Sequence, residues 1–182
     1  MAKSFGWTSA NNIISFALLL PFSVAVAEPG NLTESQTPDA QLHHIPEPVE
    51  KVIVHGPLAK KYEVAFRLNP FYLRGDFNGD GKIDVAVLVK QRSTGKLGVA
   101  IVYGGTSKVT ILGAGTAIGN GGDDFQWMDA WQVYSKTRVA SGGDGQNAPH
   151  LRGDALLVGK SEAASALIYW NGKRYVWLQQ GD

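Results

Sequence analysis

The chain has 182 residues, a length that suits one globular domain with a short leader, and it contains no cysteine. The lack of cysteine excludes a disulfide framework, thiolate zinc sites and thiol nucleophiles. Lys and Arg total 17 and Asp and Glu total 16, giving a formal net charge of +1. There is thus no basic surplus to favour nucleic-acid phosphates, and we expect no nucleic-acid partner.

The N-terminus has the features of an export signal. Lys3 precedes an apolar run over residues 13–22, and Ala25-Val26-Ala27 is a small-x-small cleavage sequence. The apolar run is short for a membrane span of about 20 residues and contains Pro21. We therefore expect residues 1–27 to be a cleaved signal peptide and the protein to be periplasmic or secreted, without membrane attachment after cleavage.

The remaining chain divides into two parts. Residues 28–46 are polar and contain several prolines, so they are predicted to form a disordered leader. Residues 47–182 are predicted to form a single β-rich domain. It begins with a short helix, because Val49, Val52 and Ile53 recur at helical spacing and Gly56-Pro57 then ends the element. Residues 58–68 are compatible with either a second helix or a strand.

The most informative segment is residues 76–84, Asp-Phe-Asn-Gly-Asp-Gly-Lys-Ile-Asp. Oxygen-bearing side chains alternate along it, and Gly81 permits a sharp turn at the sixth position. Ca²⁺ takes six to eight oxygen ligands, which alternate residues of a coiled loop can supply. The expected ligands are Asp76, Asn78, Asp80 and Asp84 through their side chains and Lys82 through its backbone carbonyl. The alternative is a set of Asn-Gly and Asp-Gly turns that bind nothing.

The segment differs from an EF-hand loop. The twelfth position, where an EF-hand has a bidentate Glu, is Val87. The chain also continues into the apolar run 85–89, which predicts a buried strand and not a helix. We therefore expect Asp84 to bind the ion directly and water to complete the coordination shell.

The stretch Gly75-Asp76-Phe77-Asn78-Gly79-Asp80-Gly81, with Asp84 and the strand after it, resembles the calcium loops of FG-GAP and VCBS-type repeats. This family includes the β-propeller blades of integrin α-chains. The resemblance covers one loop and its flanking strands. It implies that the loop joins two strands and that the same five residues hold calcium: Asp76, Asn78, Asp80, Lys82 and Asp84.

The rest of the chain predicts mainly strands. Short β-rich runs separated by turn residues predict an antiparallel meander with the calcium loop at one end. Asn171-Gly172 between two β-rich runs predicts a C-terminal hairpin. The fold class is therefore expected to be mainly β (α+β). The expected strands are residues 71–73, 85–90, 97–103, 109–112, 166–170 and 174–178.

The tetrapeptide Leu-Arg-Gly-Asp occurs twice, at residues 73–76 and 151–154, and an apolar run follows each copy. A decayed duplication and a chance match are both open, and we favour chance. The second copy lacks the calcium loop.

The segment after the predicted strand 109–112 is a possible ligand surface. Residues 113–122 are Gly-rich but lack the Walker and dinucleotide-binding patterns, so they are predicted to form a surface loop. The next residues concentrate carboxylates and tryptophans: Asp123, Asp124, Trp127, Asp129 and Trp131. They could act on a glycan, stack on a sugar or peptide, or bind a second cation. The helical spacing of the two tryptophans also predicts simple core packing.

No set of residues for nucleophilic or zinc-dependent catalysis is present, so an enzyme is the less favoured class. We expect an exported calcium-binding domain with a binding or structural role. The alternatives are a periplasmic inhibitor or other interaction protein, and a glycan-binding or glycan-acting protein. The partner would be a protein or a glycan.

Overall fold

The computed structural model describes residues 44–138 and 149–181, which lie within one compact unit, Ser35–Asp182. The predicted signal peptide, and the predicted leader as far as residue 43, lie outside the described residues. No helix within the described ranges has the length and apolar character needed to cross a membrane.

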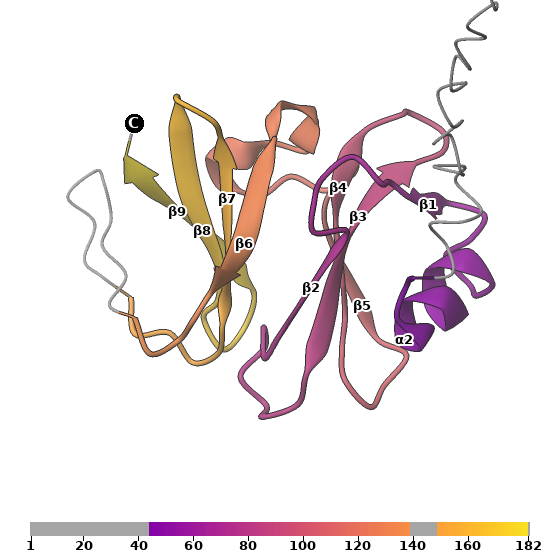
Figure 1. Cartoon of the computed structure of the whole chain (residues 1–182), viewed down its shortest axis with the longest axis horizontal. Coiled ribbons are helices and arrows are strands. Elements are labelled where there is room, and N and C mark those ends of the chain that lie inside the picture. Colours follow the sequence, from indigo (N-terminus) through magenta and orange to yellow (C-terminus); the bar gives the residue numbers. More distant parts are fainter. Residues whose placement is uncertain (1–43, 139–148, 182) are drawn as a thin grey trace, which may run out of the picture. The chain divides into compact units, whose positions relative to one another are not determined.

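The first half of this unit forms a five-stranded antiparallel sheet (Figure 1). Strands β3, β4 and β5 follow one another as a meander. On the other edge of β3, β1 pairs with residues 89–91 and β2 with residues 84–87, so β1 and β2 lie end to end along it. The strands are β1 (Tyr62–Val64), β2 (Tyr72–Gly75), β3 (Asp84–Gln91), β4 (Leu97–Val102) and β5 (Val109–Gly113).

The second half forms a four-stranded antiparallel meander in the order β6-β7-β8-β9. Residues 171–174 connect β8 to β9, and Gly172 adopts a positive φ of 96° there. The strands are β6 (Ala130–Tyr134), β7 (Ala155–Lys160), β8 (Ala164–Trp170) and β9 (Tyr175–Gly181).

One short helical segment covers the outer face of the first sheet. α2 (Glu47–Val49) continues directly into the π-helical turn η1 (Glu50–Val54). Val49, Val52 and Ile53 are buried and pack in one cluster with alternate residues of β3 and β4. The prediction of a short N-terminal helix is confirmed, and its apolar stripe is the reason it docks here.

The two sheets share a second core cluster between them. Leu88 and Ile101 of the first sheet pack with Leu156 and Ile168 of the second. Because β3 packs on this cluster with one face and on the helix with the other, residues 84–89 are all buried. This two-sided burial explains why β3 has a continuous apolar sequence instead of an alternating one.

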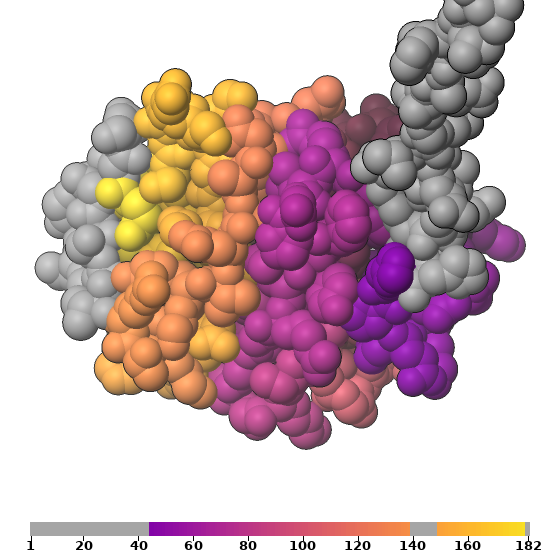
Figure 2. Space-filling view, in the orientation of Figure 1, coloured from indigo at the N-terminus to yellow at the C-terminus, as the bar shows by residue number. Residues whose placement is uncertain are grey.

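The two sheets also meet around β2 and β6, which are in contact. In the space-filling view the orange surface around β6 adjoins the magenta surface around β2 (Figure 2). Trp131 of β6 donates its indole N–H to the carbonyl of Pro70, just before β2, at 2.9 Å. Arg67 also reaches across and donates to the carbonyl of Gln126 at 2.8 Å.

The prediction of a mainly β fold is confirmed. The helical interpretation of Trp127 and Trp131 is wrong, because Trp127 lies in the 3₁₀ turn η3 (Phe125–Trp127) and Trp131 in β6. Residues 58–68, left open between helix and strand, contain β1.

Candidate metal centre

The predicted calcium loop connects β2 to β3. Asp76 directly follows β2, and Asp84 is the first residue of β3 and pairs with Gly75 across the ladder. Gly79 and Gly81 adopt φ values of 76° and 82°. This left-handed conformation favours glycine, and it allows the loop to turn back within eight residues.

Asp84 lies at the base of the loop and is completely buried. Its Oδ2 accepts the backbone N–H of Phe77 at 2.9 Å, and its Oδ1 accepts that of Gly104 at 2.9 Å. Burial raises the pKa of this carboxyl, and the two backbone N–H groups partly oppose that shift. Each oxygen has two lone pairs, so both oxygens retain acceptor capacity.

Asp76 is 6% exposed, and its two oxygens have different surroundings. Oδ2 accepts the N–H of Gly81 at 3.1 Å and lies 3.3 Å from the ammonium nitrogen of Lys136. Oδ1 is buried without a hydrogen-bond partner among the described residues. A buried carboxylate oxygen without a partner is costly, so this atom has acceptor capacity that the described residues do not use.

The exposed part of the loop is closed by local hydrogen bonds. Asn78 Oδ1 accepts the N–H of Asp80 at 2.9 Å, and Asp80 Oδ1 accepts the N–H of Lys82 at 2.9 Å. The amide nitrogen of Asn78 donates to Asp80 Oδ2 at 3.2 Å. The structure therefore brings the five predicted ligands into one loop, with most of their side-chain oxygens engaged in hydrogen bonds.

Within residues 44–138 and 149–181, no three His, Asp or Glu side chains are grouped closely enough to hold a metal ion as they stand. The chemistry of the loop nevertheless fits a hard cation, because every candidate donor is an oxygen and Asp76 Oδ1 is buried and unpaired. A soft-metal site would need thiolates or imidazoles, and the loop contains neither.

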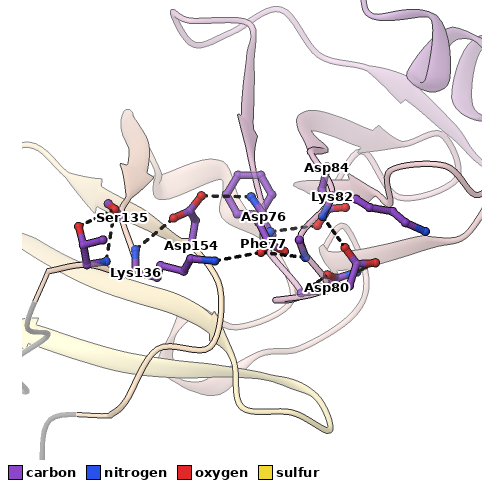
Figure 3. A network of polar contacts seen from close by, with 11 residues as sticks. Asp76, Phe77, Asp80, Lys82, Asp84, Ser135, Lys136 and Asp154 are labelled. Carbon is purple, nitrogen blue, oxygen red and sulfur yellow. Dashed lines mark hydrogen bonds and ion pairs between the residues drawn. The ribbon is translucent and has the colours of Figure 1, made fainter.

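A second loop reaches the site from the other sheet, and the sequence analysis did not predict it (Figure 3). Asp154, just before β7, accepts the N–H of Asp76 through Oδ2 and that of Lys136 through Oδ1, both at 3.1 Å. The sequence signal that could have indicated this contact is the repeated Leu-Arg-Gly-Asp. Its two copies meet at Asp76 and Asp154.

The three carboxylates of the other candidate surface have separate partners. Asp123 forms an ion pair with Lys96. Asp124 caps η3 by accepting the N–H of Gln126 at 3.1 Å and also accepts the N–H of Leu97 at 3.0 Å.

Asp129 is held by the turn between β7 and β8. It lies 2.7 Å from Lys160 Nζ and accepts the Ser161 N–H at 2.7 Å. The hydrogen bond from Lys160, followed by that from the Ser161 N–H, lowers the pKa of Asp129 to about 2.

The two tryptophans of that surface face different surroundings. Trp131 is buried in the core between the sheets, which confirms core packing for this residue. Trp131 also borders an open hollow of about 770 Å³ beside β6, β7 and β8. Trp127 is half-buried and borders a smaller hollow of about 180 Å³ with Trp177.

The Gly-rich segment packs tightly against the second sheet. The side chain of Trp177 lies close to Gly119 and Gly121. A Cβ on Gly119 would lie 2.3 Å from Trp177 Cβ, and one on Gly121 would lie 2.4 Å from the Trp177 ring. Gly121 also accepts the indole N–H of Trp127 at 3.1 Å. These two glycines therefore leave room for the Trp177 side chain.

Comparison of the chain with protein-family models, with curated proteins and with solved structures gave no match.

Proposed function

We propose that this protein is an exported calcium-binding domain whose fold is stabilised by an ion in the β2–β3 loop. The observation that supports this most directly is Asp76 Oδ1, a buried carboxylate oxygen with no partner among the described residues. Such an atom has lost its water without gaining a hydrogen bond. A hard cation would supply the missing interaction.

The distribution of charge around the loop also favours a bound cation. Asp76 and Asp84 are the buried charged residues of the described chain, and they stand at the two ends of one loop. Asp80 lies in that loop, and Asp154 contacts it from the other sheet. Within the described ranges, one ammonium group forms an ion pair with any of these four carboxylates, and it is that of Lys136. A divalent ion would balance more of this negative charge.

Asp76, Asn78, Asp80 and Asp84 would hold the ion through side-chain oxygens, and Lys82 through its carbonyl. Water would complete the shell. When bound, the ion neutralises carboxylates that the fold buries. Calcium sites of extracellular proteins function with a Kd of about 10⁻⁴–10⁻³ M. A weak site in a largely exposed loop is therefore consistent with an exported protein.

The test is the melting temperature of the full chain, measured by circular dichroism in millimolar CaCl₂ and in a chelator. Calcium should raise it, because an ion present at about ten times its Kd stabilises the folded state by about 1.4 kcal/mol. Asp80→Ala should remove most of this gain. Since Asp80 is exposed, the variant should melt close to wild type in the chelator.

Glu50→Ala is the matched control, because it removes one exposed carboxylate from η1, outside the loop. It should retain the full calcium response. Identical wild-type melting curves in calcium and in chelator would refute the proposal, and so would an Asp80→Ala protein with an undiminished response.

A further inference from the structure

Lys136 occupies an unusual position at the candidate metal centre. It is the second residue after β6 of the second sheet, yet its ammonium lies 3.3 Å from Oδ2 of Asp76, which directly follows β2 of the first sheet (Figure 3). The side chain of Lys136 is 45% exposed and that of Asp76 is 9% exposed. The ammonium therefore reaches a buried carboxylate from the solvent side.

The backbone of Lys136 is anchored independently of its side chain. Its N–H donates to Asp154 Oδ1 at 3.1 Å, and Ser135 Oγ lies 3.0 Å from the hydroxyl of Thr137. The ammonium is a flexible point charge at the end of four methylene groups. It can leave Asp76 by side-chain rotation while the Lys136 backbone N–H stays bonded to Asp154.

We propose that Lys136 is the resident counter-ion of Asp76 and that a calcium ion entering the β2–β3 loop displaces it. This inference rests on the proposed function and adds a regulator to the same site. Both cations are attracted to the same carboxylate, so the Lys136 ammonium competes with calcium and weakens its binding. Calcium binding in turn releases the side chain of Lys136 from the first sheet.

Other basic side chains near the loop are placed differently. The Lys82 side chain extends beside Gly105, and the guanidinium of Arg152 lies beside Gly172. Arg138 lies over the ring of Tyr134, 5.5 Å from its centroid. Among the described residues, Lys136 is the basic residue paired with Asp76. The effect is thus specific to one side chain and can be separated from the general charge of the surface.

The test is isothermal titration of the full chain with CaCl₂. Lys136→Met keeps the aliphatic stem and removes the charge, so calcium should bind about three- to tenfold more tightly than to wild type. Arg138→Met removes the same charge from the same connection without touching Asp76. Its affinity should stay within about twofold of wild type. Lys136→Arg, which retains the charge, should bind no more tightly than wild type.

A second measurement observes Lys136 directly. The ¹⁵N–¹H resonance of its ammonium group should be protected by Asp76 in the chelator and should lose that protection when calcium is added. The Lys136→Met spectrum assigns the resonance.

The outcomes separate the two proposals. If wild type binds calcium and Lys136→Met binds no more tightly than Arg138→Met, the inference is overturned and the proposed function stands. If neither wild type nor Lys136→Met binds calcium, both are overturned. Binding by Lys136→Met but not by wild type would overturn the proposed function, because Lys136 would then exclude calcium from the wild-type protein and not merely weaken its binding.

Discussion

Asp76 and Asp154, one beside each sheet, are joined by two hydrogen bonds, one between their backbones and one to the Asp154 side chain. The N–H of Asp154 donates to the carbonyl of Asp76 at 2.7 Å, and the N–H of Asp76 donates to Asp154 Oδ2 at 3.1 Å. Each Asp follows a buried glycine, Gly75 or Gly153. A Cβ on Gly153 would lie 2.2 Å from the carbonyl oxygen of Asp76, so this contact requires glycine.

Gly153→Ala should therefore destabilise the protein. The Cβ would strike backbone atoms, which cannot rotate away, and overpacking of this kind costs about 1–3 kcal/mol. Urea denaturation in a chelator measures the free energy of unfolding. Gly159→Ala in β7 is the control, because its Cβ has no neighbour nearer than 3.3 Å. A Gly153→Ala protein as stable as Gly159→Ala would show that the two loops do not approach as closely as described.

The two copies of Leu-Arg-Gly-Asp do not occupy corresponding places in the two sheets, although their sequences are identical. Asp84 begins β3 and accepts the N–H of Phe77, two residues after β2 ends. Asp154 precedes β7 and accepts the N–H of Lys136, two residues after β6 ends. Asp154 is thus the structural counterpart of Asp84 and not of Asp76. The two tetrapeptides therefore do not occupy equivalent positions, although Asp84 and Asp154 each accept an N–H from the second residue after the preceding strand.

Local patterns predicted the parts of the fold that depend on neighbouring residues. The helical spacing of Val49, Val52 and Ile53 indicated α2 and η1, and the apolar run after Asp84 indicated β3. The alternation of oxygen side chains located the candidate metal loop. These features follow from backbone periodicity and turn chemistry, which a sequence displays directly.

Features set by contacts distant in sequence were not predicted. β6 was missed because Trp127 and Trp131 are four residues apart, a spacing that suits a helix as well as a turn followed by a strand. The contact of Lys136 with Asp76 joins residues 60 positions apart and leaves no local pattern. The packing of Gly119 and Gly121 on Trp177 arises in the same way.

Tyr175 is predicted to tolerate loss of its hydroxyl group. That hydroxyl is buried without a hydrogen-bond partner among the described residues. Burial raises its pKa, and the neighbouring Tyr103 and the negative charges of Asp84 and Asp76 raise it further. Because Tyr175→Phe removes an unsatisfied group, the free energy of unfolding should stay within about 0.5 kcal/mol of wild type or rise.

Tyr103→Phe is the matched comparison for Tyr175→Phe. The hydroxyl of Tyr103 lies 2.7 Å from Thr110 Oγ1, so its removal should cost about 0.5–1.5 kcal/mol. Urea denaturation of both variants and of wild type measures the two losses in the free energy of unfolding. A larger loss for Tyr175→Phe than for Tyr103→Phe would show that the buried hydroxyl has a partner after all.

The ion pair between Asp129 and Lys160 predicts a pH-dependent contribution to stability. The pKa of Asp129 is lowered from an ordinary value of 3.8 to about 2, chiefly by the hydrogen bond from Lys160. The folded state therefore favours the charged carboxylate. Its contribution is fully present above pH 3.8 and is lost as the pH falls towards 2.

A carboxyl NMR titration should find the lowered pKa of Asp129 in wild type and a value nearer 3.8 in Lys160→Met, whereas Lys173→Met should leave it unchanged. The stability difference between wild type and Asp129→Asn should shrink over the same pH range. A difference that persists unchanged at pH 2 would mean that Asp129 contributes by some interaction other than its charge.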